Sequence, residues 1–194
     1  KLDVPTITGY EFHVIQLVSQ VCPHDLILPY LEETLEELRT RMPEAKFPFR
    51  ARVVLAGSEI DDPAFTKLLE MCGAMVVADR YCFGSFPSRE EIGIRPGETA
   101  FDAVCRHYLH TNQCARFMSG DKIDQRHREL ERLVREFHAD GIIYESMKFC
   151  EFWSYEKVLA SHVLQNELNV PCCTIEKEYT LGSAGQLRTR FQAF

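Results

Sequence analysis

The chain has 194 residues, of which 45% are hydrophobic and 26% are charged, a composition typical of one large globular domain with a sizeable core. Its 29 acidic residues outnumber its 22 Lys and Arg residues, and no basic run is long enough to form a phosphate-binding stripe, so we expect no nucleic-acid partner. No apolar run approaches the roughly 20 residues that span a bilayer. We therefore expect a cytoplasmic protein with no membrane partner.

Two helices are predicted at the start of the chain. Apolar residues at helical spacing predict one helix over residues 11–21 and a second that is capped by Asp25 and ends at about Met42. We interpret residues 1–46 as a helical linker region to an N-terminal domain that the chain lacks, and residues 47–194 as an α/β domain. The chain stops inside a helical pattern without a stop signal, which also indicates a fragment of a longer subunit.

Strands and helices alternate after a Pro-containing break at residues 47–49. The predicted strands are uninterrupted apolar runs, which is typical of strands buried on both faces. Repeated strand–helix units favour an α/β fold, with a Rossmann-like parallel sheet of about four strands and helices on both faces. The predicted strands are residues 52–57, 74–79, a segment that starts at 141, and 170–176. The predicted helices are residues 61–72, 99–110, 121–138 and 155–168, and an Arg-rich helix start follows the turn at 182–185. A long irregular stretch is predicted at residues 80–98.

Open parallel sheets bind ligands just beyond the carboxyl ends of their strands. Three segments qualify here, residues 57–59, 79–85 and 146–150, and we expect them to converge on one edge of the sheet. Cys82 and Cys150 are then the two thiols expected to meet. The first of these segments could cradle a phosphate, but no Walker or GxGxxG sequence supports that function, so a tight turn with a helix cap is the favoured interpretation.

Cys150 is the strongest candidate for chemistry. It follows a buried strand, with Lys148 beside it, aromatic residues around it and a helix just after it. A helix N-terminus favours a thiolate and an apolar shell limits water, conditions that suit an iron–sulfur ligand and equally a reactive thiol. A third interpretation is a small packing residue. The aromatic neighbours are Phe149, Phe152 and Trp153.

The remaining candidates form weaker patterns. The eight cysteines are irregularly spaced without a CxxC pair, so most should be packing residues, and the adjacent Cys172 and Cys173 should point to opposite faces of a strand. No GxSxG sequence supports a serine nucleophile. Four histidines on charged helix faces should be solvated and are not spaced for a zinc site: His107, His110, His127 and His138.

The segment Lys148-Phe-Cys150 at a strand end, together with two motifs downstream, resembles the 2-hydroxyacyl-CoA dehydratase and benzoyl-CoA reductase subunit family, specifically its C-terminal α/β domain. The resemblance spans nearly the whole chain, and the pairing of motifs makes it fairly specific. The other matching segments are residues 178–182 and 185–194 downstream, and residues 7–9, 57–63, 77–79, 82–84 and Cys114.

This resemblance implies a dimer of related subunits, each carrying a 4Fe–4S cluster held by three cysteines. It also implies a separate ATP-hydrolysing activator that supplies one electron at very low potential, and an acyl-CoA substrate that forms a ketyl-type radical. By position, Cys150 matches the cluster cysteine of the C-terminal domain, and the further metal ligands are expected in the N-terminal domain. Cys82 and Cys114 match positions that are often cysteine in the family, and Glu151 stands where the family often has Asp.

The branches of the family differ in reaction, either benzoyl-CoA ring reduction or 2-hydroxyacyl-CoA dehydration. The opening at residues 7–12 and the ending at residues 185–194 favour the reductase side. Two other functions stay open: a same-family electron-transfer protein with a larger iron–sulfur cluster that reduces small molecules, and a non-catalytic scaffold domain that has lost its cluster. In the last motif, Arg188 and Arg190 fit a salt bridge on the helix surface or at an interface, or contacts with CoA phosphates.

Overall fold

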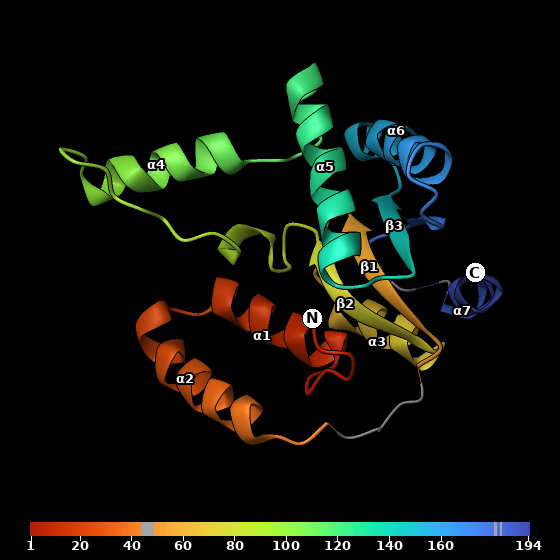
Figure 1. The fold of residues 1–194 in the computed structure, drawn as a ribbon, viewed down its shortest axis with the longest axis horizontal. Helices are drawn as coiled ribbons and strands as arrows, with labels where there is room; N and C mark the ends of the chain where they lie inside the picture. The colour runs from red at the N-terminus through yellow and green to blue at the C-terminus, as the bar shows by residue number, and fades with distance from the viewer. Residues whose placement is uncertain (44–48, 181, 183) are drawn as a thin grey trace.

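A four-stranded sheet with the order β2-β1-β3-β4 forms the centre of the protein, and all three strand pairs are parallel (Figure 1). The computed structural model describes residues 1–43, 49–180, 182 and 184–194. The predicted α/β fold with about four parallel strands is therefore confirmed. The strands are β1 (Ala51–Gly57), β2 (Ala74–Arg80), β3 (Gly141–Met147) and β4 (Cys172–Lys177).

Helices cover both faces of the sheet, as predicted. One apolar core lies between the sheet and the helices α3 (Pro63–Met71) and α7 (Ala184–Ala193), and a second lies between the sheet and α5 (Gly120–Glu136) and α6 (Glu151–Asn166). Successive residues of β1, β3 and β4 contribute to alternate cores. The adjacent cysteines of β4 follow this rule, because Cys172 belongs to the second core and Cys173 packs against the first.

The strand order creates a switch point between β1 and β3. The crossover from β1 to β2 runs in one direction through α3, and the crossovers to β3 and β4 run in the other direction through the opposite face. Opposite directions through opposite faces give all the crossovers the same hand, as the handedness rule for parallel units requires. The chain therefore leaves β1 and β3 toward different faces, and this divergence opens the crevice in which such folds bind ligands.

Local capping explains where most helices begin. Asp62 caps α3 by accepting a hydrogen bond of 2.9 Å from the Ala64 N–H, and Pro63 occupies the first turn. Thr99 and Asp102 form a capping box at the start of α4 (Ala100–Thr111). The predicted start of α6 is wrong by four residues, because Cys150 is the N-cap residue of this helix and its carbonyl already accepts the Ser154 N–H.

Two helices precede the sheet, α1 (Gly9–Val21) and α2 (His24–Thr40). Helix α1 packs on α3, where the fully buried His13 bonds to Thr66 and to the Ile60 carbonyl, and α2 contributes no buried residue. The prediction that Asp25 caps α2 is wrong: Pro23 is the N-cap residue, and Asp25 lies in the first turn. The predicted boundary between residues 46 and 47 and most of the break at 47–49 lie outside the described residues.

Helices α5 and α6 are joined by a buried ion pair. Arg126 donates to Glu156 at 2.7 Å, and neither side chain is exposed to solvent. His127 approaches the same carboxylate at 3.5 Å and is largely buried. The prediction of solvated histidines is thus wrong for His127, and also for the buried His107, because charged helix faces in this protein pack against other helices and loops.

The helix α4 extends away from the sheet (Figure 1), and several of its large apolar side chains are exposed, among them Phe101, Tyr108 and Leu109. Within the described ranges, none of the helices combines the length and apolar character that crossing a bilayer requires.

We predict that Gly57→Ala destabilises the fold by about 2 kcal/mol or more. Gly57 has a φ of 149°, and an added Cβ would overlap the carbonyl of Glu145 on the neighbouring strand. Gly93→Ala is the matched control, because no atom lies within 4 Å of an added Cβ there, and it should change stability by no more than about 0.5 kcal/mol. Urea unfolding midpoints would measure both, and equal midpoints for the two variants would contradict the prediction.

Candidate functional site

A buried carboxylate, Glu145, lies at the switch point where β1 and β3 end side by side. Its Oε2 accepts hydrogen bonds from the Ser58 hydroxyl at 2.7 Å and from the Ser58 N–H at 3.1 Å. Its Oε1 has no hydrogen-bond partner among the described residues. Glu145 is fully buried, so Oε1 is a buried polar atom whose hydrogen-bonding capacity is unused by the described residues.

Burial raises the pKa of Glu145 above its ordinary value. The two bonds from Ser58 and the positive charges of Lys177 and Lys157 oppose this shift without cancelling it. Lys177 is itself buried, with its ammonium 5.8 Å from the ring of Phe65, and Lys157 donates to Ser146 at 2.8 Å. The carboxyl ends of β3 and β4 therefore carry a compact set of acid and ammonium groups.

A tight turn connects this crevice to Cys150. The Met147 N–H donates to the Ser58 hydroxyl at 2.9 Å, and the Met147 carbonyl accepts the Cys150 N–H at 3.2 Å. Within the turn, Phe149 adopts a φ of 68°, which is costly for a bulky side chain. Lys148 is fixed at 2.8 Å to Glu178 beyond β4. These contacts hold the turn against two other strand ends.

Cys150 lies where this turn meets the first residue of α6. It is partly buried and packs against the second core, at the positive end of a helix that begins with the next residue. The expected aromatic shell is only partly present. Trp153 is buried, whereas Phe152 is 41% exposed and Phe149 is 99% exposed, so the shell prediction is wrong for Phe149.

A second group of residues lies at the carboxyl end of β2. Here a cavity of about 40 Å³ is lined by Arg80, Cys82, Cys114 and Trp153, among others. The thiol that shares a cavity with Cys82 is thus Cys114, and Cys150 is not among the lining residues. Cys82 is exposed as a whole residue, and desolvation of its thiol, followed by the neighbouring Cys114, raises the pKa of that thiol.

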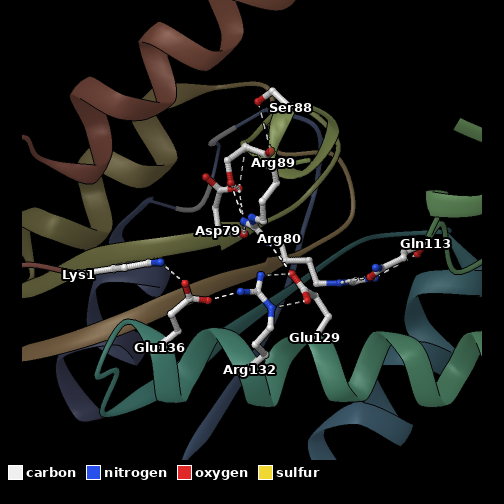
Figure 2. A network of polar contacts seen from close by, with 10 residues as sticks. Lys1, Asp79, Arg80, Ser88, Arg89, Gln113, Glu129, Arg132 and Glu136 are labelled. Atoms are coloured by element: carbon white, nitrogen blue, oxygen red, sulfur yellow. Dashed lines mark hydrogen bonds and ion pairs between the residues drawn. The ribbon is translucent and has the colours of Figure 1, made fainter. Parts of the chain in front are cut away.

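The loop that forms this cavity is anchored by an ionic network (Figure 2). Asp79 accepts the Ser85 N–H at 2.7 Å and the Ser85 hydroxyl at 3.0 Å, while Arg89 donates to the Asp79 carbonyl at 2.5 Å. Arg89 also binds Glu129 of α5 at 2.8 Å, and Arg132 holds the same carboxylate. Burial raises the pKa of Asp79, and Arg89 and Ser85 oppose the shift.

These residues cannot hold an iron–sulfur cluster by themselves. A 4Fe–4S cluster takes three or four cysteine ligands. In the part of the chain that the structure describes, no three His, Cys, Asp or Glu side chains come together as a metal site. A cluster at Cys150 would need further ligands beyond those that the described residues bring together.

The motif at residues 185–194 lies on α7, away from Glu145, Cys150 and the cavity beside Cys82. Arg190 donates to the Thr174 carbonyl at 2.7 Å, which fixes the helix to β4, and Arg188 is exposed. Sequence reasoning missed Glu145 and Arg80. One signal in the sequence could have identified these two residues. Each is a charged residue that follows an apolar run predicted to be a buried strand.

We predict that the free energy of unfolding of the Glu145→Gln variant exceeds that of the unchanged protein by a margin that grows as the pH rises. The folded-state pKa of Glu145 is raised above the ordinary value of about 4.5, so above that pH the unfolded chain loses its proton first. Proton loss then favours unfolding, until the pH passes the raised folded-state value. Gln cannot ionise, so its advantage should grow through this window, as measured by urea unfolding at a series of pH values.

Glu178→Gln is the control with the opposite sign. The hydrogen bond and charge of Lys148 lower the pKa of the exposed Glu178, so the native pair stabilises the protein at neutral pH and loses this effect as pH falls. The control should therefore be slightly less stable at neutral pH, with a difference that shrinks in acid. A Glu145→Gln advantage that is constant with pH would contradict the prediction.

Comparisons with known proteins support the resemblance seen in the sequence. A family model described as 2-hydroxyglutaryl-CoA dehydratase, D-component, matches residues 1–194. A protein of Escherichia coli (strain K12) named as a dehydratase subunit, YjiM, is 27% identical over 198 residues, covering 100% of this chain and 50% of that protein. The (R)-phenyllactyl-CoA dehydratase beta subunit of Clostridium sporogenes is 27% identical over 169 residues, covering 84% of this chain and 43% of that protein.

The chain spans about half the length of the curated relatives that it matches. The family model, in contrast, matches every residue of the chain. The chain belongs to the 2-hydroxyglutaryl-CoA dehydratase D-component family.

Proposed function

We propose that the chain is the cluster-binding part of a subunit of an ATP-activated, low-potential one-electron enzyme that acts on acyl-CoA thioesters. The observation that carries this proposal is the position of Cys150, at the end of the turn after a central strand and at the first turn of α6. The family resemblance assigns a cluster cysteine to this position. A related second subunit and an ATP-hydrolysing activator are the partners that the proposal requires.

The residues around Cys150 suit a thiolate ligand. Cys150 occupies the N-cap position of α6, the helix end where ligands of negative charge are favoured, and Trp153, one turn further along the helix, is buried against the second core. The ion pair of Lys148 with Glu178 fixes the preceding turn. The 4Fe–4S cluster, when bound, would supply one electron at low potential to the thioester.

Dehydration of a 2-hydroxyacyl-CoA is the reaction that we favour. The family description and the name of the Clostridium sporogenes relative both support the dehydratase branch, whereas the opening at residues 7–12 and the ending at residues 185–194 favour the reductase branch. We therefore expect the enzyme in its complete assembly to eliminate water from a 2-hydroxyacyl-CoA. Product analysis with a 2-hydroxyacyl-CoA and with benzoyl-CoA, in the presence of activator and ATP, separates the branches, and turnover of benzoyl-CoA alone would reverse the choice.

We predict that Cys150→Ser in the protein at its natural length lowers the iron and sulfide content and removes the EPR signal of the reduced 4Fe–4S cluster. A serine hydroxyl is a poor replacement for a thiolate ligand. Anaerobic iron and sulfide analysis with EPR would measure the effect.

Cys105→Ser is the matched control for this prediction. Cys105 is exposed on α4 and lies outside the groups described above, so its loss should leave iron content and EPR signal unchanged. If the Cys150 variant retains both iron and signal, Cys150 is a packing residue and the proposal fails at its central point. A 4Fe–4S stoichiometry of one per subunit would also count against the larger cluster of an electron-transfer protein.

A further inference from the structure

Arg80 is a buried cation with an unused donor. Its side chain is only 2% exposed. The Nε and Nη2 groups donate to the Gln113 side-chain oxygen at 3.2 and 2.9 Å, and Nη2 also donates to the Gln113 carbonyl at 3.1 Å (Figure 2). Nη1 has no hydrogen-bond partner among the described residues. One edge of the guanidinium is therefore saturated by a neutral amide, and the other nitrogen is free.

No described carboxylate forms an ion pair with Arg80, and Glu156 and Glu129 act on its charge only from beyond ion-pair distance. Asp79 and Glu129 both interact with Arg89, and Glu156 is bound to Arg126. Among residues 1–43, 49–180, 182 and 184–194, no acidic group lies within ion-pair distance of Arg80. Burying an arginine without a counter-charge is costly, and a neutral glutamine offsets this cost only in part.

The free nitrogen belongs to a side chain that lines a cavity. The cavity holds about 40 Å³, and its walls include Cys82, Cys114, Phe86 and Trp153. The rings of Trp153 and Phe86 lie 5.8 and 5.9 Å from the guanidinium carbon, so aromatic faces surround the cation. This volume admits a group of a few heavy atoms and is far below the roughly 300 Å³ of a pocket that encloses a whole cofactor.

We propose that this cavity binds the carboxylate group of a small ligand, through the free Nη1 of Arg80. A carboxylate supplies the single negative charge that the buried guanidinium lacks, and its planar oxygens match the guanidinium donors. A water molecule could fill the same space but would leave the charge uncompensated. The inference is independent of the cluster proposal, because it uses neither Cys150 nor any iron.

Two thiols at the cavity allow a direct test with matched reagents. Iodoacetate carries a carboxylate and iodoacetamide is its neutral counterpart; in both reactions the thiolate sulfur forms a bond to the CH₂ carbon, the C–I bond breaks, and iodide leaves. Because both reagents react with the same thiolate, the fraction of the cysteine that is ionised cancels in the ratio of the two rates. Exposed Cys105 provides the reference ratio within the same protein. Peptide mapping by mass spectrometry after timed labelling of the natural-length protein measures each cysteine separately.

We expect the iodoacetate-to-iodoacetamide ratio at Cys82 or Cys114 to exceed that at Cys105 on the order of tenfold, the factor for one charge-assisted contact of about 1.4 kcal/mol. Arg80→Gln should abolish the excess. The exposed Arg116, two residues from Cys114, provides the control variant Arg116→Gln, which should retain it. Equal ratios at all three cysteines in the unchanged protein would overturn the proposal.

A second measurement avoids reliance on the Arg80 variant, which removes a buried group and could fail to fold. Formate, a minimal carboxylate, should raise the Tm of the unchanged protein, because a ligand that binds only the folded state stabilises it. Formamide, its neutral counterpart, should not. An identical response to sodium formate and to sodium chloride at equal ionic strength would show that no carboxylate site exists.

Discussion

The contact between the ends of β1 and β3 is the constraint on which the rest of the structure depends. Gly57 has no side chain, so the backbone of β3 can approach it closely. Ser58 then uses one hydroxyl in two directions, donating to Glu145 and accepting the Met147 N–H. Met147 in turn accepts the N–H that closes the turn to Cys150. A buried carboxyl group, a hydroxyl and a turn therefore form one continuous set of bonds, which determines where the proposed cluster ligand lies.

Buried charges at this edge of the sheet are satisfied to different degrees. Arg126 and Glu156 neutralise each other between two helices, and Asp79 is held by a backbone N–H and a hydroxyl, with Arg89 close by. In structural pairs of this kind the two opposite charges compensate each other within the protein. Glu145 and Arg80 also keep one polar atom each without a hydrogen-bond partner in the described parts of the chain, as Arg126 and Glu156 do, but neither Glu145 nor Arg80 forms an ion pair there. Such residual capacity is typical of sites that bind or react.

Much of the fold could be predicted from local sequence. Uninterrupted apolar runs identified the strands, and the Asp62–Pro63 pair identified the start of α3, because these signals are properties of neighbouring residues. The predictions failed where the deciding contact is distant in sequence. Arg126 lies on a highly charged helix that looks solvated, and only the arrival of Glu156, thirty residues later, explains its burial. His127 was misjudged for the same reason.

The sequence predicted where the site lies, but not which residues lie next to one another in it. The carboxyl edge of a parallel sheet was the expected location, and Cys150 lies at the end of a strand there, as expected. The pairing of Cys82 with Cys114 could not be predicted, because it depends on how the loop after α4 folds back toward β2. Asp25 shows the limit of capping rules in a different way: a good cap residue is not used when the helix begins two residues earlier, with Pro23 in the N-cap position.

Phe149 has a consequence for how this protein would respond to selection. Its backbone occupies the left-handed region, which costs about 1–2 kcal/mol for a residue with a side chain, and its ring gains no burial in return. Glycine would make the same turn without that cost. Selection for thermal tolerance alone would therefore replace the phenylalanine. A phenylalanine kept here is therefore one that the stability of the fold does not account for.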